Sequence, residues 1–218
     1  MGSLRRFDLK RIISEFKIEY FFETGTWRGD GLCYASQFNF KALFSSEIMP
    51  EFANSSSLRF QNDLRVNVIL NNSIDALQLT LPDIDGNCIF WLDAHYPGAD
   101  EGINDYNEFA DEKIRLPLEK ELDIIVQRVN KFQDVILVDD LRIYELGRYD
   151  YGNISENIIP PKVRNIKFIE RLFSETHEIM RSYNDEGYVY LLPKNKFKKN
   201  FLVRGYDFIS LKFRDKVY

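Results

Sequence analysis

The fold of this chain is decided by the stretch Phe22-Glu23-Thr24-Gly25-Thr26-Trp27-Arg28-Gly29-Asp30-Gly31, which follows an apolar run and packs three glycines into one turn. Glycine has no Cβ, so such a loop lets the backbone approach a bound molecule closely, and the helix that follows offers free N–H groups. An acid at the end of the preceding strand can accept a hydrogen bond from a ribose or an amine. The stretch therefore predicts a strand-to-helix turn around a nucleotide-like ligand, as in a Rossmann-type domain.

The glycine spacing argues against a dinucleotide as that ligand. The order is G-x-x-x-G-x-G instead of G-x-G-x-x-G, and the carboxylate of Glu23 just before it would repel a pyrophosphate. A cationic cofactor fits better. The loop resembles the first motif of class I S-adenosylmethionine-dependent methyltransferases, in which an acid precedes the first glycine and faces the amino group of the methionine moiety. It departs from the commonest form, E/D-x-G-x-G-x-G, by carrying Trp27 and Arg28 before Gly29. A plain glycine-rich turn is the structural alternative.

The composition is that of one globular domain. Of 218 residues, 44% are hydrophobic, which is enough to bury a sizeable core, and no apolar run is long enough to span a membrane. The N-terminus lacks the apolar segment of a secretion signal, and the two cysteines, Cys33 and Cys88, lie in a predicted helix and a predicted buried strand. We therefore expect a single domain over residues 1–218 and a cytoplasmic location.

The net charge of −5 is unevenly distributed along the chain. Residues 194–218 contain eight Lys or Arg and two Asp, which leaves the rest of the chain at −11. We interpret this basic C-terminal extension as a solvated segment, with a partner of opposite charge as the alternative. An acidic chain without a basic, aromatic-interleaved face is not expected to bind nucleic acid. The sequence leaves open whether the protein forms a homo-oligomer.

Short apolar runs alternate with helical patterns over most of the chain. The expected strands of this part are Ile18–Phe22, Ala42–Ser46, Val66–Leu70, Cys88–Leu92 and Val135–Val138. Helices are expected between them at 30–37, 50–60, 73–79 and 117–130, and residues 1–16 are expected to form an amphipathic helix that packs on the domain. The alternation predicts an α/β fold with a Rossmann-like, doubly wound sheet.

The pattern changes after residue 160. A helix is expected at Val163–Phe173, followed by strands at Glu178–Ser182 and Tyr188–Leu192 that are separated by turn residues and so predict a hairpin. The sheet is then mostly parallel with an antiparallel C-terminal hairpin. This arrangement again resembles the class I methyltransferase fold, whose last strand is inserted antiparallel.

Candidate cofactor-binding residues follow the strand ends, because ligands of open α/β sheets bind beyond the carboxyl ends of the strands. Glu47 ends the second strand, where a carboxylate can accept from both ribose hydroxyls, and a helix N-terminal acid is its alternative role. Ser73 follows the third strand, where the family usually places adenine contacts, and it is also a candidate N-cap. The resemblance implies a cofactor site made of Glu23, Thr24, Gly25, Thr26, Gly29, Gly31, Glu47, Ser73 and Asp93.

Three carboxylates follow the next two strands, with Asp93 after the fourth and the pair Asp139 and Asp140 after the fifth. Such a cluster is a hard oxygen site of the kind that Mg²⁺ or Mn²⁺ occupies, and its mutual repulsion is costly without a cation or a shared proton. The arrangement resembles the metal site of macrocin-type and related sugar O-methyltransferases. That resemblance implies that Asp93, Asp139 and Asp140 are metal ligands, with helix capping as the alternative.

His95 lies two residues after Asp93, at the mouth of the expected site. An imidazole with an ordinary pKa of about 6.5 suits removal of a hydroxyl proton, so His95 and Asp93 are the expected catalytic residues. Metal ligation is the competing role for His95. The other histidine, His177, has no such company and is expected to be structural. The long connections 96–113 and 141–160 lie at the ligand edge and are candidate lids or specificity elements.

Together the two resemblances imply a metal-assisted O-methyltransferase. It would pass a methyl group from S-adenosylmethionine to a hydroxyl of a sugar or glycosylated small molecule. Three alternatives stay open: a metal-independent methyltransferase acting on another nucleophile, a catalytically silent cofactor-binding module, and a fold that binds a nucleotide-sugar or nicotinamide instead.

Overall fold

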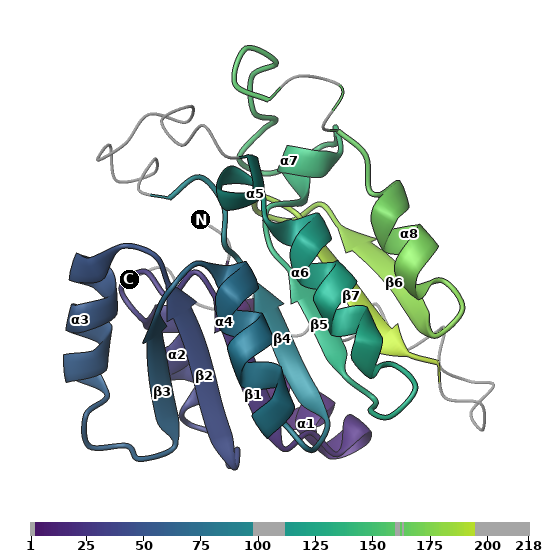
Figure 1. Ribbon diagram of the computed structural model, residues 1–218. Helices are drawn as coiled ribbons and strands as arrows, with labels where there is room; N and C mark the ends of the chain where they lie inside the picture. The colour runs from purple at the N-terminus through teal and green to yellow at the C-terminus, as the bar shows by residue number, and fades with distance from the viewer. Residues whose placement is uncertain (1–2, 98–111, 160–161, 163, 195–218) are drawn as a thin grey trace, which may run out of the picture.

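The computed structural model describes residues 3–97, 112–159, 162 and 164–194. Its strands form one seven-stranded sheet in the order β3-β2-β1-β4-β5-β7-β6 (Figure 1). The strands are β1 (Tyr20–Thr24), β2 (Ala42–Glu47), β3 (Val66–Leu70), β4 (Cys88–Leu92), β5 (Val135–Val138), β6 (His177–Ser182) and β7 (Tyr188–Pro193). The first five are parallel, and β7 lies antiparallel between β5 and β6. The prediction of a mostly parallel sheet with an antiparallel C-terminal hairpin is confirmed.

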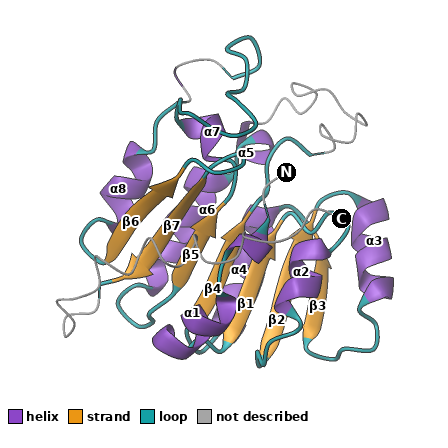
Figure 2. Cartoon of the chain, turned by 180° about the vertical axis from the view of Figure 1, so that it is seen from behind, coloured by secondary structure: helices purple, strands orange, loops and turns teal. Residues whose placement is uncertain are grey.

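Helices cover both faces of this sheet. They are α1 (Leu9–Phe16), α2 (Asp30–Ala35), α3 (Pro50–Arg59), α4 (Ser73–Thr80), α5 (Glu112–Arg115), α6 (Leu118–Ile125), α7 (Leu141–Tyr144) and α8 (Lys167–Phe173), with 3-10 turns η1 (Leu4–Arg6), η2 (Leu81–Asp83) and η3 (Val126–Arg128). Figure 1 shows α4, α6 and α8 in front of the sheet, and Figure 2 shows α1 and α2 on the opposite face. The small helices α5 and α7 lie at the carboxyl ends of the strands (Figure 1). No helix of the described ranges is both long enough and apolar enough to cross a membrane.

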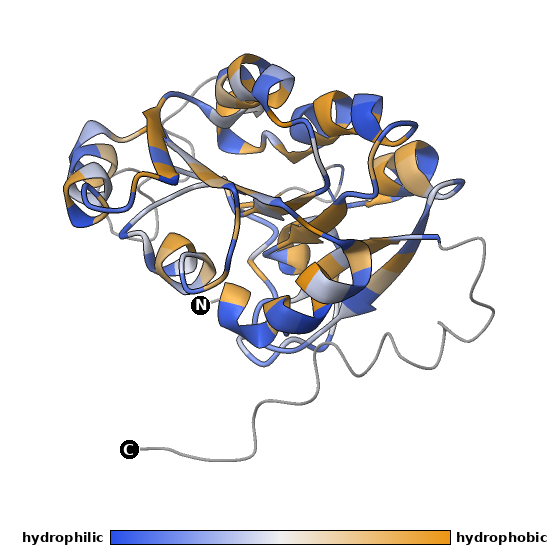
Figure 3. Ribbon diagram, turned by 90° about the horizontal axis from the view of Figure 1, so that it is seen from below, coloured by the Kyte–Doolittle hydropathy of each residue, from blue (hydrophilic) through white to orange (hydrophobic). Residues whose placement is uncertain are grey.

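The core lies in two layers, one on each side of the sheet, as the buried strand β4 illustrates. Every residue of β4 is buried, and successive side chains point to opposite faces. Cys88 and Phe90 pack with the α4 and α6 layer, whereas Ile89 and Trp91 pack with the α1 and α2 layer. Figure 3 shows the result, with hydrophobic strands between helices that carry hydrophobic and hydrophilic residues side by side. A strand covered on both faces reads as a continuous apolar run, which is why the sequence predicted β4 with its correct bounds.

The N-terminal part differs from the prediction in two places. Residues 1–16 do not form one helix: η1 ends before Phe7, which has extended backbone angles, and the carboxylate of Asp8 then caps α1 by accepting from the N–H of Arg11. The predicted strand Ile18–Phe22 is placed two residues too early. Lys17, with a left-handed φ of 52°, ends α1. Residues 18 and 19 then connect the helix to the sheet, so β1 spans Tyr20–Thr24.

The later boundaries are closer to the prediction. The predicted helix 117–130 is α6 followed by the 3-10 turn η3, and the predicted helix Val163–Phe173 begins later, at Lys167. The connections 96–113 and 141–160 contain two short helices that were not predicted, α5 and α7. Residues 98–111 and, in the basic C-terminal extension, residues 195–218 lie outside the described residues.

A buried ion pair joins the starts of β4 and β5. Arg128, 7% exposed, contacts Asp134 with 2.8 Å between Nε and Oδ2, and it donates to the carbonyls of Ile84 and Gly86. Asp134 also accepts the N–H of Cys88 at 2.8 Å. The pair thus supplies hydrogen-bond partners for backbone N–H and carbonyl groups near the starts of these two strands.

Replacing Arg128 by Met should destabilise the fold by about 3–5 kcal/mol, because it leaves the buried carboxylate of Asp134 without its cation. The free energy of unfolding from urea titration measures this. The control is Arg171→Met, since Arg171 pairs with Glu119 at an exposed surface and its loss should cost under about 1 kcal/mol. Equal costs for the two variants would contradict a structural role for the buried pair.

Candidate active site

A cavity of about 490 Å³ lies at the carboxyl ends of the strands. Its walls come from the glycine loop after β1, the ends of β2, β3, β4 and β5, and the N-terminal turn η1. Most of the predicted site residues line it: Glu23, Gly25, Thr26, Gly31, Glu47, Ser73, Asp93, His95, Asp139 and Asp140. Of the predicted site residues, only Thr24 and Gly29 do not. The structure therefore gathers at one cavity residues that are up to 117 positions apart in the chain, from Glu23 to Asp140.

Gly25 shapes the floor of the cavity. It has a φ of +81°, and a Cβ built on it would lie 2.8 Å from the carbonyl oxygen of Asp93. Its N–H donates to the carbonyl of Ser46 at 2.9 Å, so the loop is fixed to the end of β2 as well as pressed against the end of β4. Only glycine fits a backbone with this φ at this distance. Gly29, at the N-cap position of α2, has a similar φ of +76° but faces α3 and not the cavity.

Glu23 is buried at the end of β1 and lies beneath the first turn of α2. Its Oε2 accepts from the hydroxyl of Ser45 at 2.6 Å, and Ser45 in turn contacts the hydroxyl of Thr26 at 2.6 Å. Burial raises the pKa of Glu23 to about 8, with a further increase from the neighbouring carboxylates of Asp93 and Glu47. A buried acid of this kind is stabilised in its charged form when a cation binds beside it.

Glu47 holds the glycine loop from the side of β2. Its Oε2 accepts the N–H of Trp27 at 2.7 Å and its Oε1 accepts the N–H of Met49 at 2.9 Å. Burial raises its pKa and these backbone donors oppose the increase. A carboxylate oxygen can accept more than one hydrogen bond, so Glu47 can fix the loop and still meet a hydroxyl in the cavity.

The segment after β3 contains the third predicted group of cofactor contacts. Ser73 lines the cavity. Its alternative role as the N-cap of α4 is wrong. The N-cap is Asn72, whose side chain accepts the N–H of Asp75 at 2.9 Å. The cap prediction was one residue late because Asn and Ser are similarly good caps and the sequence offers both in succession.

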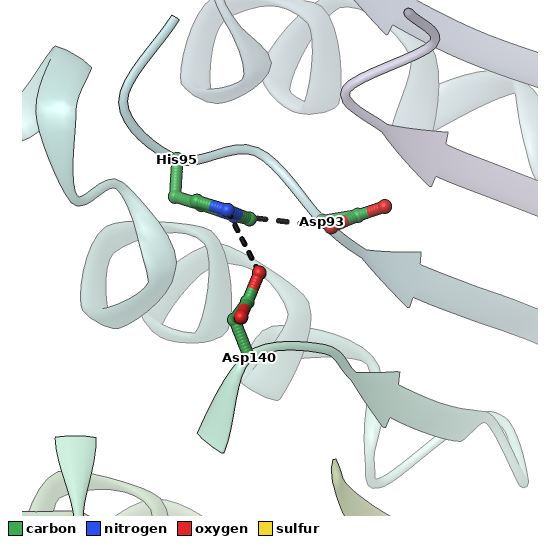
Figure 4. Close-up of side chains that lie close together, drawn as sticks. All are labelled: Asp93, His95 and Asp140. Carbon is green, nitrogen blue, oxygen red and sulfur yellow. Dashed lines mark ion pairs between the residues drawn. The ribbon is translucent and has the colours of Figure 1, made fainter. Parts of the chain in front are cut away.

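The end of β4 and the end of β5 bring a histidine and two carboxylates together (Figure 4). Nε2 of His95 donates to Oδ2 of Asp140 at 2.8 Å, and its Nδ1 lies 3.8 Å from Oδ1 of Asp93. One potential ligand atom from each of the three residues falls within 4.8 Å of the others. Two carboxylates and an imidazole are a donor set that suits Mn²⁺ and, with added waters, Mg²⁺.

Asp139 and Asp140 differ although they are adjacent. Asp139 is buried and accepts the N–H of Asp140 at 2.8 Å, and burial, followed by the charges of Asp93 and Asp140, raises its pKa well above the ordinary value. Burial also acts to raise the pKa of Asp140, but His95 and Arg142 outweigh it and hold that pKa below its ordinary value. Asp139 lines the cavity without joining the three-residue cluster, so its role as a ligand stays a prediction.

Arg142, which the sequence placed only in a candidate lid or specificity connection, and Glu186, which it did not predict, support this cluster. Asp140 has a left-handed φ of 52° at the start of α7, and Nε of Arg142 donates to its Oδ1 at 3.0 Å. Arg142 also pairs with Glu186 from the β6–β7 turn, which lines the cavity. The sequence has no local signal for this contact, because Arg142 and Glu186 are 44 residues apart.

Glu121 is a second unpredicted residue beside the cavity. It is 1% exposed on α6, between the buried Leu118 and Leu122, and its Oε1 has no hydrogen-bond partner among the described residues. Burial raises its pKa to about 7, while the hydroxyls of Ser73 and Thr24 oppose the increase. An acid inside the apolar stripe of an amphipathic helix was the available signal.

The second histidine and the two cysteines do not line this cavity. His177 is 3% exposed, and its ring contacts the hydroxyl of Thr176 at 2.8 Å and the carbonyl of Asp134 at 3.0 Å. It does not line the cavity, in keeping with the expected structural role. Cys33 and Cys88 are both free thiols.

The strand order, the inserted antiparallel strand and the glycine loop after β1 together define the class I methyltransferase fold. Solved structures with this fold match the chain over most of its length. A proposed caffeoyl-CoA O-methyltransferase of Staphylococcus aureus is 14% identical, with a TM-score of 0.58, over 88% of this chain and 84% of that one. A proposed rRNA methylase of Clostridium thermocellum is also 14% identical, with a TM-score of 0.55, over 88% and 98%.

An O-methyltransferase of Bacillus cereus, solved with S-adenosylhomocysteine, is likewise 14% identical, with a TM-score of 0.54, over 89% of this chain and 82% of that one. No protein-family model matches the sequence, and no curated protein is significantly similar to it in sequence. Identities this low show the fold alone. The neighbours are named for different acceptors, so the fold does not determine what is methylated.

Replacing Gly25 by Ala should destabilise the protein more than replacing Gly152, whose φ of +75° is similar but which has nothing within 4 Å. Both variants should lose about 1–2 kcal/mol of stability because alanine disfavours the left-handed conformation. Only in Gly25→Ala would the new Cβ also clash with the Asp93 carbonyl. Urea unfolding of the two variants gives the comparison. Equal losses of stability would show that the approach of β1 to β4 is not tight.

Replacing Glu121 by Gln should remove a pH dependence of stability. Because the folded-state pKa of about 7 lies above the ordinary 4.5, the wild type loses stability as the pH rises from about 4.5 to 7. The loss amounts to about 3 kcal/mol from the pKa difference. Between pH 5 and pH 8 the free energy of unfolding should therefore fall less in Glu121→Gln than in the wild type. Equal falls in the two proteins would contradict the raised pKa of Glu121.

Proposed function

We propose that this protein is an S-adenosylmethionine-dependent O-methyltransferase. The cofactor would occupy the cavity with its amino-acid end at Glu23 and the glycine loop, its ribose at Glu47 and its adenine near Ser73. Thr24 and Gly29, which do not line the cavity, would act by shaping the loop. The same fold in the Bacillus cereus O-methyltransferase was solved with S-adenosylhomocysteine, which supports this choice of cofactor.

The observation that carries the proposal is the pairing of His95 with Asp140 in the cavity that also contains the glycine loop. Since Nε2 of His95 donates to Asp140, Nδ1 is the atom that would take the proton of an acceptor hydroxyl. Asp140 would orient the imidazole and stabilise its charged form, and Asp93 would help to place the hydroxyl. When bound, the cofactor would supply an electrophilic methyl group, whose carbon–sulfur bond would break as the acceptor oxygen takes the methyl carbon.

A divalent cation fits the same residues. Asp93 and Asp140 would hold Mg²⁺ or Mn²⁺, with His95 or Asp139 as a further ligand. Such an ion lowers the pKa of a hydroxyl bound to it. The excess of carboxylates around the cavity supports a bound cation, because neighbouring negative charges in a partly buried site repel one another.

The proposed acceptor is a hydroxyl of a sugar or glycosylated small molecule. Its support is the resemblance of the paired aspartates Asp139 and Asp140, with Asp93 on the neighbouring strand, to macrocin-type sugar O-methyltransferases. A polyhydroxylated acceptor can offer two adjacent oxygens to one metal ion, which suits a cluster of this kind. A nucleic acid is a poor match for an acidic cavity, and we propose that the protein works in the cytoplasm on a small molecule.

A metal-independent methyltransferase is the second candidate. The contacts of Asp140 favour it, because Oδ2 lies 2.8 Å from His95 and Oδ1 accepts from Arg142, so a metal ion would compete with one of these partners. In that case the histidine and the aspartate form a base and its orienting acid without an ion.

Calorimetric titration of S-adenosylhomocysteine, with and without Mn²⁺, is the experiment that tests the proposal. We expect one cofactor product bound per chain and a separate binding event for the metal alone. Asp140→Asn should weaken the metal by at least about tenfold and leave cofactor binding nearly unchanged. Asp123→Asn, at an exposed position of α6 that pairs with Lys120, is the matched control and should change neither.

The outcomes separate the candidates. Cofactor binding without metal binding, together with methyl transfer that resists a chelator, would support the metal-independent enzyme. No binding of S-adenosylhomocysteine under any condition would remove the methyltransferase assignment altogether.

A further inference from the structure

The N-terminal turn η1 contributes an arginine to an otherwise acidic cavity. Arg5 is the only Arg or Lys among the described residues that line it. Seven carboxylate side chains share the same lining: Glu23, Asp30, Glu47, Asp93, Asp139, Asp140 and Glu186. A single permanent cation in these surroundings is a specific feature, because the cavity as a whole attracts positive and not negative charge.

The guanidinium of Arg5 forms no ion pair with any described residue. It lies over the ring of Tyr34, 5.6 Å from the ring centroid, a contact that is weak at an exposed position. The next residue behaves differently, since Arg6 pairs with Asp185 in the β6–β7 turn. Of two adjacent arginines, one fastens the segment to the domain and the other is left to meet a ligand.

The backbone around Arg5 is firmly anchored. The N–H of Ser3 donates to the hydroxyl of Tyr188 at 3.1 Å, and Leu4 and Phe7 are each 1% exposed within the core. The position of Arg5 beside the cavity is therefore fixed, while its exposed side chain can still turn. This combination suits a residue that closes over a bound molecule.

Tyr34 fixes which end of the cavity Arg5 faces. It belongs to α2, one turn after Asp30 and Gly31, which both line the cavity, and Gly31 lies against the carboxylate of Glu23. Under the proposed function, this is where the amino-acid end of the cofactor lies. That end carries one carboxylate, which would otherwise face the acids Glu23 and Asp30 without an arginine or lysine beside it.

We propose that Arg5 binds the carboxylate of the methionine moiety of the cofactor. The inference rests on the proposed function, and it assigns the N-terminal turn to the cofactor site. The planar guanidinium can donate two parallel hydrogen bonds to a carboxylate. Arg5 and Glu23 then divide the zwitterion between them, the arginine taking the carboxylate and the glutamate the amino group.

The test compares two probes in calorimetry, S-adenosylhomocysteine and S-adenosyl-3-thiopropylamine, which is the same molecule without its carboxylate. Arg5→Gln should weaken S-adenosylhomocysteine by about tenfold, the effect of one charge-assisted hydrogen-bonded pair. Binding of the carboxylate-free probe should stay within twofold of the wild type. Thermal unfolding of the variant should match the wild type, because the side chain of Arg5 is exposed.

Lys10→Gln is the matched control. Lys10 lies on the exposed side of α1 outside the cavity, and its loss changes the net charge by the same amount. It should leave both probes unchanged, which separates a direct contact from a general charge effect. If Arg5→Gln weakens both probes equally, or neither, Arg5 does not bind the carboxylate. If the wild type binds neither probe, the proposed function itself fails, a result distinct from either of these.

Discussion

The close approach of Gly25 to Asp93 is the constraint on which the rest of the site depends. A side chain at Gly25 would meet the Asp93 carbonyl at 2.8 Å, and the N–H of Asp93 donates both to the carbonyl and to the hydroxyl of Thr24. The ends of β1 and β4 are thus in direct backbone contact. Because of this contact, a molecule bound on the glycine loop would lie in the same cavity as His95 and Asp140.

Charge is the second constraint, since a partly buried cavity with seven carboxylates is unstable unless each one is compensated. The structure compensates them individually. Glu47 accepts two backbone N–H groups, Asp30 pairs with Arg59, and Asp140 contacts His95 and Arg142. The negative charges of Glu23 and Asp139 are balanced least, and burial and neighbouring carboxylates raise the pKa values of both side chains. A ligand with positive charge at both ends of the cavity would balance those charges, which is the physical reason for preferring a sulfonium cofactor and a metal ion to an anionic nucleotide.

The sequence predicted those parts of the fold and site that depend on local pattern. Val66–Leu70, Cys88–Leu92 and Val135–Val138 were predicted with their observed bounds, because each is a short, mainly apolar run between turn residues. The last two are buried throughout, whereas the edge strand Val66–Leu70 is only partly buried. Residues directly after the strands were predicted to meet because the carboxyl ends of parallel strands lie at the same edge of the sheet. Residues whose position depends on tertiary contacts were not predicted to meet. Arg142 of α7 contacts Glu186 in the β6–β7 turn. Arg5 reaches the cavity because its neighbours Ser3 and Phe7 pack against Tyr188 of β7.

The β6–β7 turn explains why the antiparallel hairpin matters to the site as well as to the topology. Its backbone carbonyls at Glu186 and Gly187 accept the first N–H groups of α7, and Glu186 pairs with Arg142, which orients Asp140. The same turn supplies Asp185 to the N-terminal turn η1. One tight turn therefore fastens two walls of the cavity, η1 and the start of α7, that lie far apart in the chain. The carboxylate cluster and the N-terminal wall are for this reason mechanically connected, and a displacement of the turn would move both.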